Sequence, residues 1–188
     1  MKTALLIIDV QQAILQGVAT PDRQAVIDSE LDRVSSRLGC LKASAEAAGM
    51  PVVLVQHDGD LGHRLAVGAE GWRFRPEIAP SDQTIIVHKR SCDSFHETDL
   101  QARLEERGID RLIVGGCMTQ FCVDTTVRRA VSNGFDVVLV EDGHATSDFG
   151  VLTADQIVAH HNRLLSGFDA GSRIVTVAPA AAIRVSDS

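Results

Sequence analysis

The sequence predicts an α/β fold, a three-layer doubly wound sandwich in which helices cover both faces of a mostly parallel six-stranded sheet. Short runs of β-branched and other apolar residues recur along the chain. Most are apolar throughout rather than alternating with polar residues, as expected for strands buried on both faces. Longer segments with helix-capping residues separate these runs. A regular alternation of strand and helix indicates an open, doubly wound parallel sheet.

The predicted strands are short, and each ends in polar or turn-forming residues. The first begins close to the N-terminus, and Asp9 interrupts its apolar run. The run is therefore too short for the core of a signal peptide and indicates a buried strand instead. The six predicted strands are Ala4–Val10, Val52–His57, Thr84–His88, Arg111–Gly115, Val137–Val140 and Arg173–Val177.

Four helices are predicted between the strands. The first begins at Thr20-Pro21, a cap residue followed by a proline, and ends at Gly49 with Pro51 beyond it. Apolar residues recur within it at steps of three and four. Similar signals predict a second helix from a capping box at Thr98 and Gln101 to Gly108, a third from Val123 to Asn133-Gly134, and a fourth from Thr153 and Gln156 to about Ser166.

Length and composition are those of an ordinary globular protein. The 188 residues suit one domain spanning 1–188, with 45% hydrophobic and 23% charged residues. A net charge of −7 and scattered basic residues argue against nucleic acid or an anionic membrane as the main partner. No apolar run approaches the length that spans a bilayer. Because the four cysteines form no CxxC pair and no export signal is evident, we expect reduced thiols and a cytoplasmic location.

Reactive side chains follow three of the predicted strands, and ligands of open α/β sheets bind beyond the carboxyl ends of the strands. The first strand leads to Asp9, the third to Lys89, and the loop after the fourth to Cys122 at the start of a helix. A helix N-terminus and a lysine ammonium both favour a thiolate. A carboxylate can take the thiol proton and later return it to a leaving group. Each residue also has common structural roles, but together they predict a nucleophile (Cys122), a base (Asp9) and a charge stabiliser (Lys89).

Three stretches of the chain carry a family resemblance. LLIIDVQ, VHKRSCDSFHETDL and LIVGGCMTQFCVDTTVRRAVSNGFDVVLVEDGHAT resemble the isochorismatase-like cysteine hydrolases, which include nicotinamidases, N-carbamoylsarcosine amidohydrolases and streptothricin hydrolases. The string G-x-x-T-x-x-C-V from Gly116 to Val123 is the most specific part. The resemblance implies a hydrolase with an Asp–Lys–Cys triad at Asp9, Lys89 and Cys122. It also implies a homo-oligomer, a dimer or a tetramer.

The resemblance further implies a cis peptide bond in the loop before Cys122. The bond is expected between Met118 and Thr119. There it would help to turn the amides of the loop, with that of Cys122, toward an oxyanion.

The cysteine at the nucleophile position favours hydrolysis of a C–N, amide-type bond of a small molecule through a thioester on Cys122. Isochorismatase itself, which cleaves a vinyl ether, has no cysteine there. Two alternatives stay open. One is isochorismatase-type ether hydrolysis that uses Asp9 alone, and the other is a non-catalytic redox-sensing protein in which Cys122 and Cys117 form a disulfide.

The substrate pocket is the least determined part of the prediction. The long irregular segment Asp58–Ser81 is rich in glycine and contains the only tryptophan, and long connections of this kind are often functional. Aromatic and polar residues near the strand ends are candidate walls for a small, partly planar substrate: Gln11, His57, Trp72, Phe95 and Phe121.

No metal or other cofactor is expected. The segment after the second strand lacks the Asp-x-His spacing of metal-dependent nicotinamidases. A metal cluster of His57, Asp58, Asp60 and His63 stays open as an alternative, because imidazole and carboxylate are suitable ligands.

Overall fold

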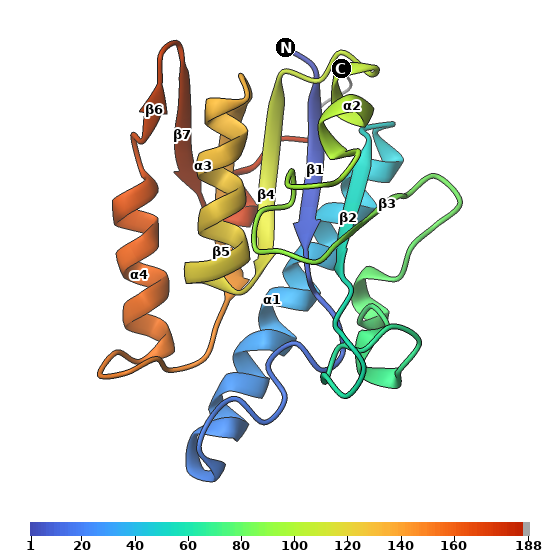
Figure 1. Ribbon diagram of the computed structural model, residues 1–188. Helices are drawn as coiled ribbons and strands as arrows, with labels where there is room; N and C mark the ends of the chain where they lie inside the picture. Colours follow the sequence, from blue (N-terminus) through green and yellow to red (C-terminus); the bar gives the residue numbers. More distant parts are fainter. Residues whose placement is uncertain (186–188) are drawn as a thin grey trace.

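The computed structural model describes residues 1–185, whose strands form a single sheet (Figure 1). The strands are β1 (Thr3–Ile8), β2 (Val52–His57), β3 (Ile85–Lys89), β4 (Arg111–Cys117), β5 (Asp136–Ala145), β6 (Asp169–Ala170) and β7 (Arg173–Ala178). Their order is β3-β2-β1-β4-β5-β7-β6, and every neighbouring pair is parallel except β6 and β7. The chain starts in the middle of the sheet and extends it toward both edges, so the predicted doubly wound α/β fold is confirmed.

The predicted number of six strands is wrong, because the sheet has seven. The additional strand, β6, contains only Asp169 and Ala170 and pairs antiparallel with the start of β7. The two strands form a hairpin whose turn contains Gly171, at a φ of +68°. A strand of two residues at a sheet edge is too short to produce an apolar pattern, so the sequence carries no periodic signal for it.

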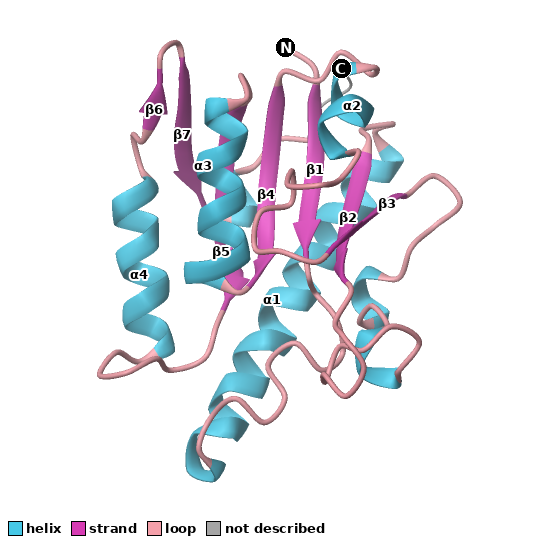
Figure 2. Ribbon diagram, viewed as in Figure 1, coloured by secondary structure: helices cyan, strands magenta, loops and turns pink. Residues whose placement is uncertain are grey.

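Helices cover both faces of the sheet (Figure 2). The helices are α1 (Pro21–Ala47), α2 (Leu100–Glu105), α3 (Asp124–Ser132) and α4 (Ala154–Leu165), and the short 3₁₀ turns are η1 (Glu70–Trp72), η2 (Pro76–Ile78) and η4 (Ala180–Ala182). Helix α1 packs on one face, α2 and α3 pack on the other, and α4 lies beside β5 and β7. Within residues 1–185, none of these helices has the length and apolarity needed to cross a bilayer.

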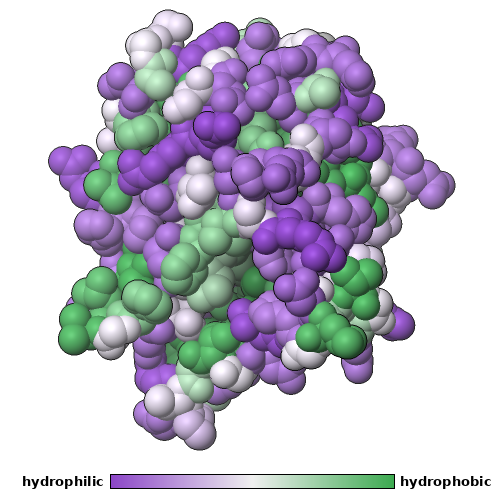
Figure 3. All heavy atoms as spheres, viewed as in Figure 1, coloured by the Kyte–Doolittle hydropathy of each residue, from purple (hydrophilic) through white to green (hydrophobic). Residues whose placement is uncertain are grey.

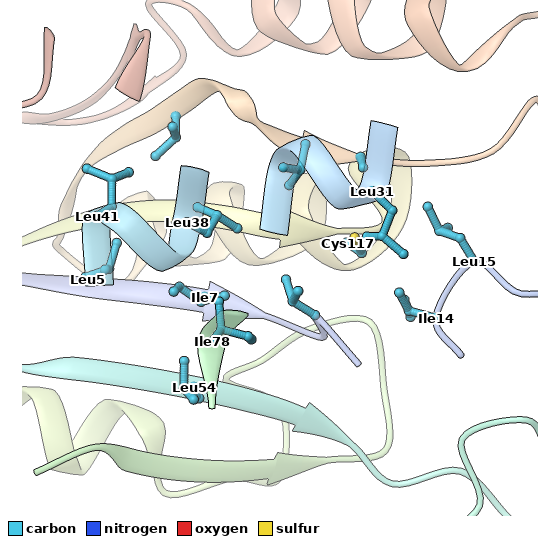
Figure 4. Packing of buried hydrophobic residues seen from close by; sticks show 14 of the residues in the cluster. Leu5, Ile7, Ile14, Leu15, Leu31, Leu38, Leu41, Leu54, Ile78 and Cys117 are labelled. Atoms are coloured by element: carbon cyan, nitrogen blue, oxygen red, sulfur yellow. The ribbon is translucent and has the colours of Figure 1, made fainter. Parts of the chain in front are cut away.

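The hydrophobic core has two halves, one on each face of the sheet. In β1, Leu5 and Ile7 point into the half beneath α1, whereas Leu6 and Ile8 point toward α2 and α3. Figure 4 shows the first half, with Leu38 of α1 close to the strand side chains. All of these side chains are buried. Burial on both faces explains why the central strands are apolar along their whole length.

The predicted helix caps are right at α4 and wrong at α2. At α4, the Gln156 amide donates to Thr153 Oγ1 and the Thr153 amide donates to Gln156 Oε1, which confirms the capping box. Helix α2 begins instead after Asp99. Thr98 lies one residue before this cap position. Its hydroxyl donates a 2.7 Å hydrogen bond to the Ser94 carbonyl oxygen and accepts a 3.3 Å hydrogen bond from the Leu100 amide, so the predicted pairing with Gln101 does not form.

The third predicted helix begins earlier than expected, with a π-helical turn, η3 (Thr119–Val123), that continues into α3. The cis peptide bond lies between Cys117 and Met118, so the prediction of Met118–Thr119 is wrong by one bond. Strand β4 still pairs with β5 at Cys117, opposite Ala145, and the chain leaves the sheet immediately afterwards. Thr119 is already the first residue of the turn.

Strand β5 extends five residues beyond the predicted Val140 and ends at Ala145. A shift in register on β4, between Val114 and Gly116, places His144 opposite Gly116. Gly116 has a φ of +129°, and a Cβ there would collide with the carbonyl oxygen of Ile8. The ends of β1 and β4 can therefore approach closely only because this residue is glycine.

Candidate active site

Three side chains from three strand ends meet at the carboxyl edge of the sheet. Asp9 directly follows β1, Lys89 is the last residue of β3, and Cys122 lies in η3 after β4. Lys89 Nζ is 2.6 Å from Asp9 Oδ2 and donates a 3.3 Å hydrogen bond to Cys122 Sγ. The side chains of Lys89 and Asp9 are 0% and 1% exposed. The structure thus brings the three predicted residues together around an ion pair that is shielded from water.

The backbone around this ion pair is held by the sheet. Asp9 has a φ of +52°, a left-handed conformation that is uncommon for residues other than glycine. Its amide donates to the Val55 carbonyl oxygen, and its own carbonyl oxygen accepts from the Gln11 amide. Lys89 Nζ also donates to the Ser91 carbonyl oxygen at 2.8 Å. These contacts impose an unusual conformation on Asp9 and aim its carboxylate at Lys89.

Burial and mutual charge shift the pKa values of the pair. Burial raises the pKa of Asp9 well above its ordinary value and the adjacent Cys122 raises it further, while Lys89 opposes both effects. Burial alone would lower the pKa of Lys89, but the charges of Asp9 and Cys122 outweigh it and the pKa is raised. Lys89 therefore stays protonated, and Asp9 is a stronger base than an exposed aspartate.

A second thiol, which the sequence analysis did not assign to the site, lies beside Cys122. A hydrogen bond with Cys92, followed by burial, raises the pKa of Cys122. The same hydrogen bond, with help from the Lys89 charge, lowers the pKa of Cys92 to about 6. Cys117 lies in the hydrophobic core, where burial raises its pKa. The thiol beside Cys122 is therefore Cys92. The feature of the sequence that could have identified it is its position in the loop that follows Lys89.

The predicted oxyanion loop turns tightly after Met118. The Met118 carbonyl oxygen accepts a 3.1 Å hydrogen bond from the Phe121 amide. Thr119 is buried, and its hydroxyl oxygen is 3.0 Å from His144 Nδ1. The first amides of a helical turn lack acceptors within it, so the start of this turn is a natural place for donors to an anion beside Cys122.

Three of the predicted pocket residues are joined by hydrogen bonds at the ends of β1 and β2. Buried Gln11 accepts from the His57 amide at 2.9 Å and donates to the carbonyl oxygens of His57 and Trp72 at 3.0 and 2.8 Å. Burial lowers the pKa of His57, whose ring is close enough to Asp9 and Lys89 to be affected by both charges. Gln11 thus joins the ends of β1 and β2 to the long loop, and His57 is the member with an ionisable side chain near the site.

The two predicted phenylalanines lie in different environments. Phe95 is 9% exposed and stacks on Phe135 in the core half beneath α2 and α3. Phe121 adjoins Cys122 in the chain, is 36% exposed and packs edge-on against Phe149. Figure 3 shows hydrophobic patches interrupting an otherwise mostly hydrophilic face of the molecule. Of the two, Phe121 lies at the surface, whereas Phe95 belongs to the core.

The long loop after β2 is tied down by its own polar contacts. Asp58 Oδ1 accepts a 2.8 Å hydrogen bond from Trp72 Nε1 and is 3.1 Å from His88 Nδ1. Asp60 pairs with Arg90 at the surface. Both aspartates of the metal cluster considered from the sequence therefore have other partners. Within residues 1–185, no three His, Cys, Asp or Glu side chains gather as metal ligands would.

A polar hollow of about 340 Å³ opens beside the site. A larger cleft of about 690 Å³ lies between α1, the end of β5 and α4, and none of the three clustered residues lines it. The hollow is lined by Asp58, His88, Lys89, Arg90, Ser91, His96 and Glu97. Since only the hollow includes a member of the cluster, it is the better candidate for holding a substrate.

The sequence model of the isochorismatase domain matches residues 3–177. The chain belongs to the isochorismatase family. A crystal structure of an isochorismatase from Pseudomonas putida KT2440 is similar with a TM-score of 0.84 at 29% identity, and the match covers 97% of this chain and 90% of that one. The match includes the strands that deliver Asp9, Lys89 and Cys122, and it confirms the family and fold predicted from the sequence.

Relatives in the isochorismatase family include proteins named for hydrolysis. The chain is 33% identical over 183 residues to a streptothricin hydrolase from Streptomyces noursei. That match covers 96% of this chain but only 63% of the relative, so this chain spans less than two thirds of its length. The chain is also 27% identical to the ureidoacrylate amidohydrolase RutB from Stutzerimonas stutzeri (strain A1501), over 82% of this chain and 68% of that protein. The chain thus shares the isochorismatase family with proteins that are named as hydrolases.

Proposed function

We propose that this protein is a hydrolase that cleaves a C–N bond of a small molecule through a thioester on Cys122, with Asp9 and Lys89 as its catalytic partners. The observation that carries the proposal is the contact of Lys89 Nζ with both Asp9 Oδ2 (2.6 Å) and Cys122 Sγ (3.3 Å). A hydrolase that used Asp9 alone would have no need for a thiol at this position. The relative named an amidohydrolase supports the same bond type.

The mechanism has two halves that share one base. Asp9 takes the thiol proton as Cys122 Sγ attacks the substrate carbonyl carbon, and the Lys89 ammonium stabilises the negative charge. Asp9 then gives the proton to the leaving nitrogen, the C–N bond breaks, and ammonia or an amine departs. Water next attacks the thioester and loses a proton to Asp9, which returns it to the departing thiolate. The raised pKa of Asp9 suits it to both transfers.

The test is a screen of small amides and ureides for ammonia release. We expect activity in the wild type and none above background in Cys122→Ala, with an acyl adduct on Cys122 in intact-mass spectra of the wild type. Asp9→Asn should lose activity as well, because it removes the base. Activity that survives Cys122→Ala but not Asp9→Asn would instead favour ether-type hydrolysis, and the absence of any adduct would overturn the proposal.

We also propose that the chain functions as a homo-oligomer. Phe121 and Phe149 pack against each other at the surface, and the neighbouring Val151 and Leu152 are 97% and 45% exposed. Exposed apolar groups of this kind are typical of protein contacts. Light scattering should give a dimer or tetramer, and Phe149→Ser should shift it toward monomer. A wild-type monomer at micromolar concentration would contradict this.

A further inference from the structure

A polar chain of three side chains lies behind the loop that carries Cys122. His144, near the end of β5, is 2% exposed. Its Nδ1 is 3.0 Å from Thr119 Oγ1, and its Nε2 is 2.9 Å from Asn162 Oδ1 of α4. The mechanism proposed above uses neither His144 nor Asn162. His144 is thus a buried polar group joined both to the loop of the candidate nucleophile and to the half-buried Asn162, and its role there needs an explanation.

The hydrogen-bond pattern shows which atoms of Asn162, His144 and Thr119 carry the shared protons. Asn162 Nδ2 donates to the Glu141 carbonyl oxygen at 2.9 Å, so Asn162 presents its oxygen to His144. An amide oxygen can only accept, and His144 Nε2 therefore carries the proton. Burial lowers the pKa of His144 to about 4, so the ring is neutral near pH 7 and its Nδ1 has no proton. Nδ1 must then accept the hydroxyl proton of Thr119, which fixes the direction of that hydroxyl.

A second hydrogen bond from the same strand holds the next residue of the loop. Thr146 Oγ1 donates to Gln120 Oε1 at 2.7 Å. Thr146 directly follows β5, two residues after His144, and both side chains reach η3, while Ala145 between them pairs with Cys117 of β4. The first two residues of η3, Thr119 and Gln120, are thus held to the end of β5 by two side-chain hydrogen bonds, three and two residues before Cys122.

We propose that Asn162 and His144 are positioning residues that hold the Thr119 hydroxyl and thereby fix the loop whose amides stabilise the oxyanion formed at Cys122. The inference rests on the proposed thioester chemistry. Asn162 sets the tautomer of His144, His144 accepts from Thr119, and Thr119 sets the angle at which the loop leaves β4. None of the three exchanges a proton with the substrate. A displacement of about 1 Å in such a loop can cost roughly a hundredfold in rate.

Charged groups from three elements surround His144 and bear on any test that varies the pH. Asp142 raises its pKa and His161 lowers it, both less than burial does. The other charged residues lining the same cleft are Glu30 and Arg37 of α1, Glu141 of β5, and Asp155 and Arg163 of α4. Arg37 pairs with Asp142 at 3.1 Å. The uncharged Asn162 is the direct partner of Nε2, so a change at this position alters the protonation of the ring most directly.

The first experiment compares two substitutions at Thr119 with two thiol probes. Acylation of Cys122 by p-nitrophenyl acetate forms an oxyanion, whereas alkylation by iodoacetamide does not. Thr119→Val keeps the shape of the side chain but loses the hydroxyl, and Thr119→Ser keeps the hydroxyl. We expect Thr119→Val to lower the acylation rate roughly tenfold to a hundredfold and to change alkylation less than twofold. Thr119→Ser should restore most of the acylation rate.

The second experiment uses the pH profile of acylation in Asn162→Asp. A carboxylate at this position would stabilise the protonated ring and raise the pKa of His144. A protonated Nδ1 cannot accept from Thr119, so acylation should decline at a pH at least one unit higher than in the wild type. His160→Gln, on the exposed side of the same helix, is the matched control and should keep the wild-type profile. This test remains available if Thr119→Val does not fold.

The outcomes separate this inference from the proposed function. If wild-type Cys122 is not acylated at all, the thioester proposal is overturned, and so is the inference that rests on it. If the wild type is acylated but Thr119→Val matches it, or if Asn162→Asp keeps the wild-type profile, only the positioning role is overturned. Equal losses of acylation and alkylation in Thr119→Val would also overturn it, because they would indicate general damage to the site.

Discussion

Two consecutive residues, Lys89 at the end of β3 and Arg90 just after it, form ion pairs that differ in their exposure to water. Lys89 pairs with Asp9 at 2.6 Å with both side chains essentially unexposed, while Arg90 pairs with Asp60 at 3.0 Å with side chains 69% and 88% exposed. The distances are similar, but only the first pair is removed from water. Burial shifts the pKa values of Asp9 and Lys89. The two pairs therefore differ in their exposure to water rather than in their distance.

The largest effect should come from breaking the buried pair. Lys89→Met leaves the Asp9 carboxyl buried without its cation, and loss of one partner of a buried ion pair typically costs about 3–5 kcal/mol. We expect a loss of that order in the free energy of unfolding, measured in urea, together with loss of hydrolysis. A variant as stable as the wild type would show that the buried pair contributes no more than the exposed one.

A smaller effect is expected on the pH dependence of stability, and it should differ between a buried and an exposed histidine. An unfolded histidine takes up a proton below about pH 6.5, whereas buried His144 does so only near its pKa of about 4. The unfolded state therefore binds the additional proton in this window, and stability falls as the pH falls through it, by at most about 3 kcal/mol.

The measurement is urea unfolding between pH 7 and pH 4 for the wild type, His144→Gln and His160→Gln. The decrease of the free energy of unfolding with falling pH should be smaller in His144→Gln, because the variant has no ionisable group at this position. It should persist in His160→Gln, since residue 160 is exposed. Parallel curves for all three proteins would rule out His144 as the source.

A third prediction concerns the thiol beside the ion pair. Because the hydrogen bond with Cys92 raises the pKa of Cys122, Cys92→Ala should lower it. We expect Cys122 in this variant to react with iodoacetamide several-fold faster than in the wild type near pH 7, because the thiolate is the reactive form. Alkylation rates against pH, with the labelled residue identified by mass spectrometry, provide the measurement. Cys40→Ala, at an exposed cysteine on α1, is the matched control.

The smallest effect is expected at the exposed pair. Arg90→Ala should change the free energy of unfolding by no more than about 0.5 kcal/mol, because water and salt already screen such pairs. Urea unfolding at low and high salt would check this. A loss comparable to that of Lys89→Met would mean that exposure is not what distinguishes the two pairs.

Much of the fold could be predicted from local patterns. The continuous apolar runs of β1, β2 and β4 reflect burial on both faces, and the cap residues of α4 lie where the chain uses them. Strand β6 and the second half of β5 could not be predicted. The first is too short for a pattern, and the second contains Glu141, Asp142 and Gly143, whose polar character hides the strand.

The sequence by itself determined the three strand ends that carry Asp9, Lys89 and Cys122. Parallel strands place their carboxyl ends at one edge of the sheet, so the order of residues along the chain was enough to bring these three together. The tertiary structure alone decided which neighbours they have. Cys92 reaches Cys122 through a loop, and His144 reaches Thr119 only because β5 shifts its register against β4. Such contacts depend on loop paths and side-chain packing across elements, which leave no periodic trace in the sequence.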